Sequence, residues 1–158
     1  MLQSVSSPYI QSLLEFDFTR TEIRLVSELA KTDLEKFLGN RPNQPVPVKQ
    51  FRLFAQQMVA ALKALECRGI VHYDIKPSNI LLYRFDCRLA KLADFGLAKW
   101  EGDSLDVEGL RGTPIYMAPE ILTKVETPSG KSDLWGMGKG SKTCFAKQKL
   151  LRHVKYSM

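Results

Sequence analysis

A short polar segment between two apolar stretches places the strongest constraint on this chain. It reads His-Tyr-Asp-Ile-Lys-Pro-Ser-Asn over residues 72–79 and brings Asp74, Lys76 and Asn79 within six positions. A carboxylate in such a loop can accept a proton from an attacking hydroxyl. A lysine two positions later can balance negative charge on a transferred group. The sequence therefore predicts a loop that carries chemistry and is held between two strands.

A second carboxylate follows in Asp94-Phe95-Gly96, fifteen residues after Asn79. Mg²⁺ binds few protein oxygens and shares the phosphate oxygens of its substrate, so two oxygen-bearing side chains from adjacent loops suit it. The pattern predicts Asn79 and Asp94 as metal ligands. Each piece alone is a weak signal, because a lone Asp in a loop is usually a turn residue.

The order and spacing of these pieces are more specific than any one of them. His-x-Asp-x-Lys-Pro-x-Asn and Asp-Phe-Gly are followed by Gly-Thr-Pro-Ile-Tyr-Met-Ala-Pro-Glu over residues 112–120. This set resembles the protein kinase superfamily, and Lys76 with Gly112-Thr113 is similar to its serine/threonine branch. The resemblance implies an α+β, protein kinase-like fold. Partial N-lobe strands and a hinge would precede an incomplete, mainly helical C-lobe.

The resemblance also implies roles for individual residues of the two loops. Asp74 resembles the catalytic base that orients and deprotonates the substrate hydroxyl, and Lys76 the residue that steadies the γ-phosphate. Asn79 and Asp94 resemble the two Mg²⁺ ligands. The implied cofactors are ATP and Mg²⁺, and the implied partner is a protein substrate.

Residues 26–30 are similar to the last N-lobe strand entering the hinge. Glu28 and Ala30 would offer backbone groups to adenine, beside Ser27 as a small gatekeeper, and Leu81 would lie beneath the base. For Asp33 two readings stay open, contact with the ribose and capping of the helix that follows it.

Three residues further along the chain match the activation segment and its support. Thr113 matches the Thr that bonds the catalytic Asp and Lys, and Glu120 resembles the partner of a buried Arg. Asp133 resembles the helix residue that braces the catalytic loop. No arginine in the remaining sequence has the context expected of the partner of Glu120.

Local patterns predict the secondary structure around these motifs. Apolar residues at three- and four-residue steps predict a helix over residues 48–67, and we expect this apolar stripe to pack in the core. We also expect a pair of strands over residues 9–18 and 22–29 and a short capped helix over residues 34–38. Three short β-like segments are expected over residues 69–72, 80–83 and 89–92. A long loop is expected over residues 97–114.

The resemblance covers about residues 8–138 and implies an incomplete domain. We find no Gly-x-Gly-x-x-Gly phosphate loop, no strand lysine in a Val-Ala-Ile-Lys context and no apolar continuation after Gly138. We therefore expect a partial kinase domain over residues 1–138 and a basic, disordered tail over residues 139–158, in a truncated, alternatively spliced or mispredicted product. The implied reaction is transfer of the ATP γ-phosphoryl group to protein Ser or Thr hydroxyls. The alternative is an inactive fragment that acts as a non-catalytic interaction module.

Charge and composition exclude several other classes of protein. The net charge is +6, but residues 139–158 carry six basic and no acidic residues, so residues 1–138 are neutral. A dedicated nucleic-acid-binding domain is therefore not expected. Aliphatic runs are too short to span a bilayer, and the first residues lack the basic and apolar regions of a secretory signal, so we expect neither. Three widely spaced cysteines suit a reducing compartment, so we expect a cytoplasmic or nuclear location.

Two other motifs give weaker signals. Residues 125–132 nearly fit the nucleotide-binding pattern Gly-x-x-x-x-Gly-Lys-Ser, but Val125 replaces the first Gly and no apolar strand precedes it. The basic tail over residues 139–158 could bind nucleic acid or anionic lipid. Because it has no apolar face and little aromatic content, a solvated tail is the favoured interpretation.

Overall fold

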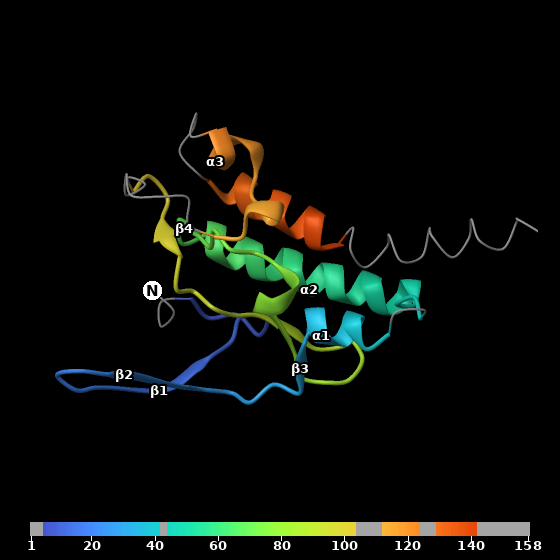
Figure 1. The fold of residues 1–158 in the computed structure, drawn as a ribbon, viewed down its shortest axis with the longest axis horizontal. Coiled ribbons are helices and arrows are strands. Elements are labelled where there is room, and N and C mark those ends of the chain that lie inside the picture. The colour runs from blue at the N-terminus through green and yellow to red at the C-terminus, as the bar shows by residue number, and fades with distance from the viewer. Residues whose placement is uncertain (1–4, 42–43, 104–111, 124–128, 142–158) are drawn as a thin grey trace, which may run out of the picture.

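The computed structural model describes residues 5–41, 44–103, 112–123 and 129–141 (Figure 1). Two short 3₁₀ turns, η2 and η3, join the strands and helices. The elements in chain order are β1 (Leu13–Phe18), β2 (Ile23–Ser27), β3 (Thr32–Asp33), α1 (Leu34–Gly39), α2 (Val48–Glu66), β4 (Ile70–Val71), η2 (Pro77–Asn79), β5 (Ile80–Leu82), β6 (Ala90–Leu92), β7 (Lys99–Trp100), η3 (Pro114–Tyr116) and α3 (Pro119–Thr123). Residues 130–141 are also helical. This mixture of small sheets and helices is the α+β arrangement expected from the sequence.

Helix α2 runs through the middle of the molecule and organises its core (Figure 1). It buries one face, as the 3.6-residue period predicts, and its buried apolar side chains are Phe54, Met58, Ala61, Leu62 and Leu65. Against this face lie residues of the strands that carry the candidate site, including Ile80, Leu82 and Leu92. The predicted helix over residues 48–67 is confirmed, and the site strands are fixed on its buried side.

The small sheet β3-β5-β6 brings the two predicted loops together. Strand β5 pairs antiparallel with β6, with Ile80 opposite Leu92. One step beyond this pair, the Ala93 amide donates to the Asn79 carbonyl at 2.9 Å. Since Asn79 ends one loop and Asp94 begins the other, the pairing sets the two predicted metal ligands side by side in the fold.

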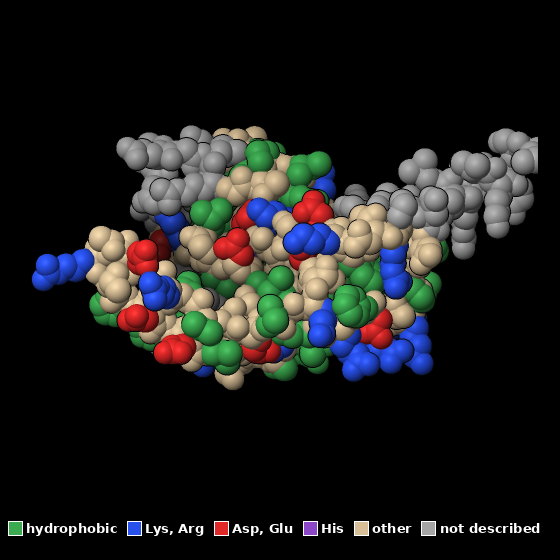
Figure 2. Space-filling view, turned by 60° about the horizontal axis from the view of Figure 1, so that its bottom comes forward, with side chains coloured by type: hydrophobic (Ala, Val, Ile, Leu, Met, Phe, Trp, Pro, Cys, Tyr) green, Lys and Arg blue, Asp and Glu red, His purple; other side chains and the backbone are tan. Residues whose placement is uncertain are grey.

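The hairpin β1–β2 projects from the rest of the structure (Figure 1). The pairs Phe16–Leu25 and Phe18–Ile23 lie opposite each other across it. These four side chains are exposed, and Figure 2 shows hydrophobic side chains at the surface among charged ones. The two predicted strands are confirmed, but their apolar residues do not contribute to the core of the described residues.

One segment differs from the sequence-based expectation. The predicted loop over residues 97–114 contains strand β7, in which Trp100 pairs with Ile70 and Lys99 with Val71 of β4. Pairing between residues so far apart in the sequence leaves no periodic pattern in the local sequence, so β7 was not predicted. Residues 104–111 of the predicted loop lie outside the described part. The last helix extends past Gly138 to Ser141.

The division of the chain at residue 138 stays a prediction, because residues 142–158 lie outside the described part. So do residues 125–128 of the segment that resembles a nucleotide-binding loop. Among the residues described, none of the helices has the length and apolar character needed to cross a membrane.

Candidate active site

Asp74 lies at the centre of a hydrogen-bonded cluster and is only 7% exposed. Its Oδ1 accepts the Thr113 amide at 3.1 Å and the Thr113 hydroxyl at 3.0 Å. Its Oδ2 pairs with Lys76 Nζ at 2.6 Å and accepts Asn79 Nδ2 at 3.0 Å. The structure thus brings together four residues that the sequence separates by up to 39 positions.

These contacts keep Asp74 ionised at neutral pH. Burial raises the pKa of the carboxyl, but hydrogen bonds from Lys76 and Thr113 and the charge of Lys76 more than offset it, so the pKa lies below its usual value. Lys76 Nζ also donates to Thr113 Oγ1 at 2.9 Å, which closes a triangle around Asp74. The arrangement presents a fixed, charged acceptor beside a fixed cation.

A carboxylate from the last helix holds the backbone of the loop over residues 72–79, the candidate catalytic loop. Asp133 Oδ2 accepts the His72 amide at 2.7 Å, and its Oδ1 accepts the Tyr73 amide at 3.0 Å. Tyr73 has a φ of 70°, a left-handed conformation that costs energy outside glycine. Asp133 is 3% exposed, and burial raises its pKa to about 6 although the two amides lower it. The position matches the brace expected for Asp133.

His72 joins the catalytic loop to the Asp-Phe-Gly loop. Its ring is fully buried, its Nε2 lies 3.0 Å from the Ala93 carbonyl, and it meets the Phe95 ring edge-on at 4.7 Å. Burial lowers the pKa of His72, so the neutral ring is favoured and its Nε2–H donates to Ala93. The histidine therefore packs the two loops together and is not placed to transfer protons.

The two predicted metal ligands occupy different environments. Asn79 is buried, and its Nδ2 donates to the Asp74 carbonyl at 2.9 Å as well as to the Asp74 carboxylate. Asp94 is exposed, has a φ of 62°, and its Oδ1 accepts the Gly96 amide at 3.3 Å. Because Nδ2 is the donor atom of Asn79, the amide oxygen is left to serve as a ligand, and the hard oxygen set fits Mg²⁺.

A cavity of about 350 Å³ opens between the hairpin and Asp94. Its lining combines polar and apolar groups from both parts: Gln11, Ser12, Leu13, Leu25, Ser27, Asp94, Phe95 and Gly96. The predicted gatekeeper Ser27 is therefore part of the wall of this cavity. The volume is in the range of small-ligand sites in proteins.

The predicted base-binding residues lie on the connection between β2 and β3 and on β5. The Glu28 carbonyl accepts Gln11 Nε2 at 3.3 Å and the Tyr83 hydroxyl at 3.4 Å. Ala30 is half-buried on the same connection, and half-buried Leu81 pairs with Asp33 across β5 and β3. Asp33 itself caps α1, because its Oδ1 accepts the Lys36 amide at 2.8 Å. The capping interpretation of Asp33 is confirmed.

The activation-segment residues are supported in two ways. Gly112 has a φ of 116°, and a Cβ there would lie 3.2 Å from the Tyr73 carbonyl, so glycine is required beside the catalytic loop. Glu120 Oε1 accepts the Ser132 hydroxyl at 2.8 Å. Among the described residues, Ser132 is therefore a partner of Glu120, and the sequence pattern of a buried Arg gave no signal for it.

Sequence reasoning also missed an ion pair at the edge of the site. Lys91 Nζ lies 2.8 and 2.7 Å from the two carboxylate oxygens of Glu28. A lone lysine in the middle of a three-residue strand carries no motif. Only the proximity of β6 to Glu28 reveals the contact.

An α+β fold with an acid–lysine–asparagine loop beside an Asp-Phe-Gly loop defines a class of phosphotransferases. Comparison with known proteins identifies the family. The model of the protein kinase domain matches residues 1–157, and the chain belongs to the protein kinase family.

Several curated proteins similar to the chain are serine/threonine-protein kinases. It is 38% identical over 139 residues to serine/threonine-protein kinase ULK3 of Xenopus laevis and likewise to that of Homo sapiens. It is 34% identical over 146 residues to human serine/threonine-protein kinase ULK1. Each match covers 87% of this chain but 29%, 29% and 14% of the relative. The chain thus spans less than a third of the length of these relatives.

Proposed function

We propose that the protein is a serine/threonine protein kinase domain that transfers the γ-phosphoryl group of ATP to Ser or Thr hydroxyls of a protein substrate. The observation that carries the proposal is the cluster around Asp74. A buried, ionised carboxylate is fixed by Lys76, Asn79 and Thr113 at distances of 2.6 to 3.1 Å. Phosphoryl transfer depends on such positioning and on charge balance.

Each residue has a chemical task in this proposal. Asp74 accepts a hydrogen bond from the substrate hydroxyl and takes its proton as the hydroxyl oxygen bonds to the γ-phosphorus, while the bond from that phosphorus to the β,γ-bridging oxygen breaks and ADP leaves. Its lowered pKa makes it a weak base, so its main contribution is to orient the hydroxyl. Lys76 lies beside it and balances charge on the transferred group.

The nucleotide would lie between the Asp-Phe-Gly loop and the connection after β2. Asn79 and Asp94 would hold Mg²⁺, which neutralises charge on the phosphates. The backbone groups of Glu28 and Ala30 would bind the edge of adenine, with Leu81 beneath the ring. A base that uses the Glu28 carbonyl has to compete with Gln11 or Tyr83, since a carbonyl oxygen has two lone pairs.

The test is to purify the 158-residue chain and to measure Mg²⁺-dependent ATP binding and phosphorylation of a generic basic protein. Asp94→Ala is expected to abolish both activities, and Asp17→Ala, at an exposed hairpin position, is the matched control. Asp74→Asn is expected to keep ATP binding and to lower turnover by about 10²- to 10⁴-fold. If the wild-type chain shows neither binding nor phosphorylation, the kinase proposal fails and the non-catalytic interaction module remains.

A further inference from the structure

The connection between β2 and β3 is held by side chains from three different segments. Gln11 comes from the segment before β1, Tyr83 follows β5, and Lys91 lies within β6. All three contact Glu28, through its carbonyl or its carboxylate. The contacts of Glu28 therefore link the end of the hairpin to the rest of the fold.

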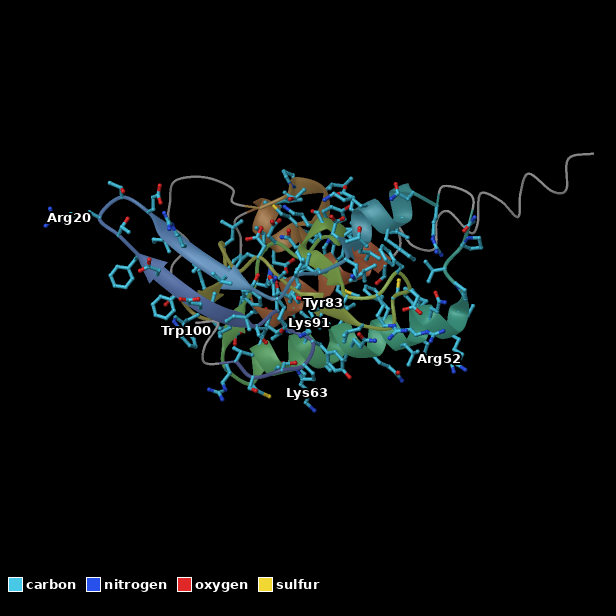
Figure 3. All side chains as sticks on the ribbon, turned by 90° about the horizontal axis from the view of Figure 1, so that it is seen from below. Arg20, Arg52, Lys63, Tyr83, Lys91 and Trp100 are labelled. Atoms are coloured by element: carbon cyan, nitrogen blue, oxygen red, sulfur yellow. The ribbon has the colours of Figure 1, made fainter. Side chains whose placement is uncertain are left out.

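Lys91 is the charged residue among the three that contact Glu28, and its side chain is largely enclosed. Its Nζ contacts both Glu28 carboxylate oxygens at 2.7 and 2.8 Å, and the two side chains are 12% and 29% exposed. The same ammonium group lies 4.9 Å from the centre of the Tyr83 ring, a cation–π contact. Figure 3 shows Tyr83 and Lys91 next to each other near the middle of the view.

The Glu28–Lys91 pair differs from the Arg24–Glu22 ion pair of the hairpin. Arg24 and Glu22 are joined by one contact of 3.1 Å, and their side chains are 69% and 60% exposed. Water screens such exposed pairs, so they contribute little. The hydrogen bonds from Lys91 hold the pKa of Glu28 below its usual value, despite some burial, so the Glu28 carboxylate is ionised at neutral pH.

The place of Lys91 in the chain gives the pair its importance. Lys91 lies in the middle of β6, and the same strand leads to Asp94 three residues later. Glu28 belongs to the connection that we assign to the base of the nucleotide. The ion pair therefore joins the base-binding end of the proposed site to the metal-binding end through a single short strand.

We propose that Lys91 is a positioning residue for nucleotide binding: it fixes Glu28, and with it the base-binding connection, relative to Asp94. The proposal rests on the proposed kinase function. Loss of the charge would let the connection between β2 and β3 move, while the Asp74 cluster stays as it is. Affinity for ATP would then fall without a matching fall in the rate of chemistry.

The experiment compares three variants of the 158-residue chain. Lys91→Met removes the charge and keeps most of the side-chain stem, Lys91→Arg keeps the charge, and Arg24→Met removes the exposed pair as a control. MgATP affinity is measured by calorimetry, the KM for ATP and kcat by phosphorylation of a basic protein, and backbone mobility by hydrogen exchange at residues 27–31.

Lys91→Met is expected to raise the Kd and KM for ATP by about five- to tenfold, with kcat at saturating ATP changed less than about twofold. Exchange at residues 27–31 should become faster in this variant only. Lys91→Arg should lie near the wild type, and Arg24→Met should equal it. A Lys91→Met chain with unchanged Kd and unchanged exchange would overturn the proposal.

The two proposals fail in different ways. A wild-type chain that binds no MgATP refutes the kinase proposal, and with it the role of Lys91 in nucleotide binding. Hydrogen exchange then still decides whether Lys91 holds the connection. Wild-type binding that Lys91→Met leaves unchanged refutes only the role of Lys91.

Discussion

At the scale of single residues, the site depends on hydrogen bonds between a buried carboxylate and a strained segment of backbone. Asp133 is a carboxylate with almost no access to water, yet it accepts two backbone amides of the catalytic loop. Tyr73, held by one of these amides, has a left-handed backbone and a buried hydroxyl with no partner among the described residues. The loop therefore stores unfavourable energy that the brace from Asp133 offsets.

The raised pKa of Asp133 predicts a specific dependence of stability on pH. With a folded pKa of about 6 and an ordinary value of 3.8, the folded protein binds the proton more tightly than the unfolded chain. This stabilisation is complete below about pH 4 and is lost as pH rises through 6. The unfolding free energy of the wild type, relative to Asp133→Asn, should fall by about 2 kcal/mol between pH 4 and pH 7. Urea denaturation across this range measures it.

Glu66→Gln, at an exposed position of α2, serves as the control for this titration. It should follow the pH profile of the wild type. An offset between the wild type and Asp133→Asn that stays constant from pH 4 to pH 7 would contradict the raised pKa of Asp133.

At the scale of elements, helices α1 and α2 and the hairpin follow from local patterns. The apolar stripe of α2 and the capping residue of α1 are visible in the sequence, and both helices are found where predicted. Helix α1 has only six residues, so its start depends heavily on its cap. Asp33 accepts the Lys36 amide at 2.8 Å and pairs with the Lys36 ammonium at 3.0 Å.

Removal of this cap should destabilise the fold measurably. Asp33→Ala is expected to lower the unfolding free energy by about 1 kcal/mol, whereas Asp33→Asn should keep most of it, because asparagine caps almost as well. Burial raises the pKa of Asp33, but its bonds to Lys36 lower it overall, so the contribution of the charge is present at neutral pH and is lost in acid. Equal losses in both variants at pH 7, by urea denaturation, would contradict the capping role.

The elements that could not be predicted depend on contacts between distant residues. Strand β7 exists only because Lys99 and Trp100 meet β4, about thirty residues earlier in the sequence. The last helix continues beyond Gly138 although glycine disfavours helix, and a Cβ at Gly140 would lie 3.8 Å from Pro77. The residues that meet around Asp74 were singled out from the sequence, and their catalytic roles stay a prediction, but the Ser132 contact of Glu120 and the Lys91 contact of Glu28 were not foreseen. Neither partner carries a motif, so only the fold brings them together.

At the scale of the whole molecule, the core encloses one cysteine and leaves another at the surface. Cys67 follows α2 and is exposed, whereas Cys87 is 1% exposed and belongs to the core around α2. Cys144 lies outside the described residues. The Cys67 thiol is therefore accessible in the native state, whereas the Cys87 thiol becomes accessible only when the core opens.

We predict that Cys67 reacts with a thiol reagent in the native protein and that Cys87 reacts only when the core opens. In a Cys144→Ser chain, the ratio of the two rates should exceed about 10³, because typical domains are stable by about 5–15 kcal/mol. Mass spectrometry of labelled peptides over time gives both rates, and added urea should speed labelling of Cys87 alone. Similar rates for the two thiols in buffer would show that the core is open.

The brace from Asp133 has a consequence for how the protein is made. The amides that it holds, at His72 and Tyr73, lie 61 and 60 residues earlier in the chain. At about 5–20 residues per second, a ribosome adds Asp133 some 3–12 s after these positions. During that interval the residues of the loop have been synthesised, but the Asp133 carboxylate that accepts its two amides has not. The loop therefore reaches its final form only after the last helix has been synthesised, and a nascent chain halted before Asp133 would expose it to proteases and chaperones.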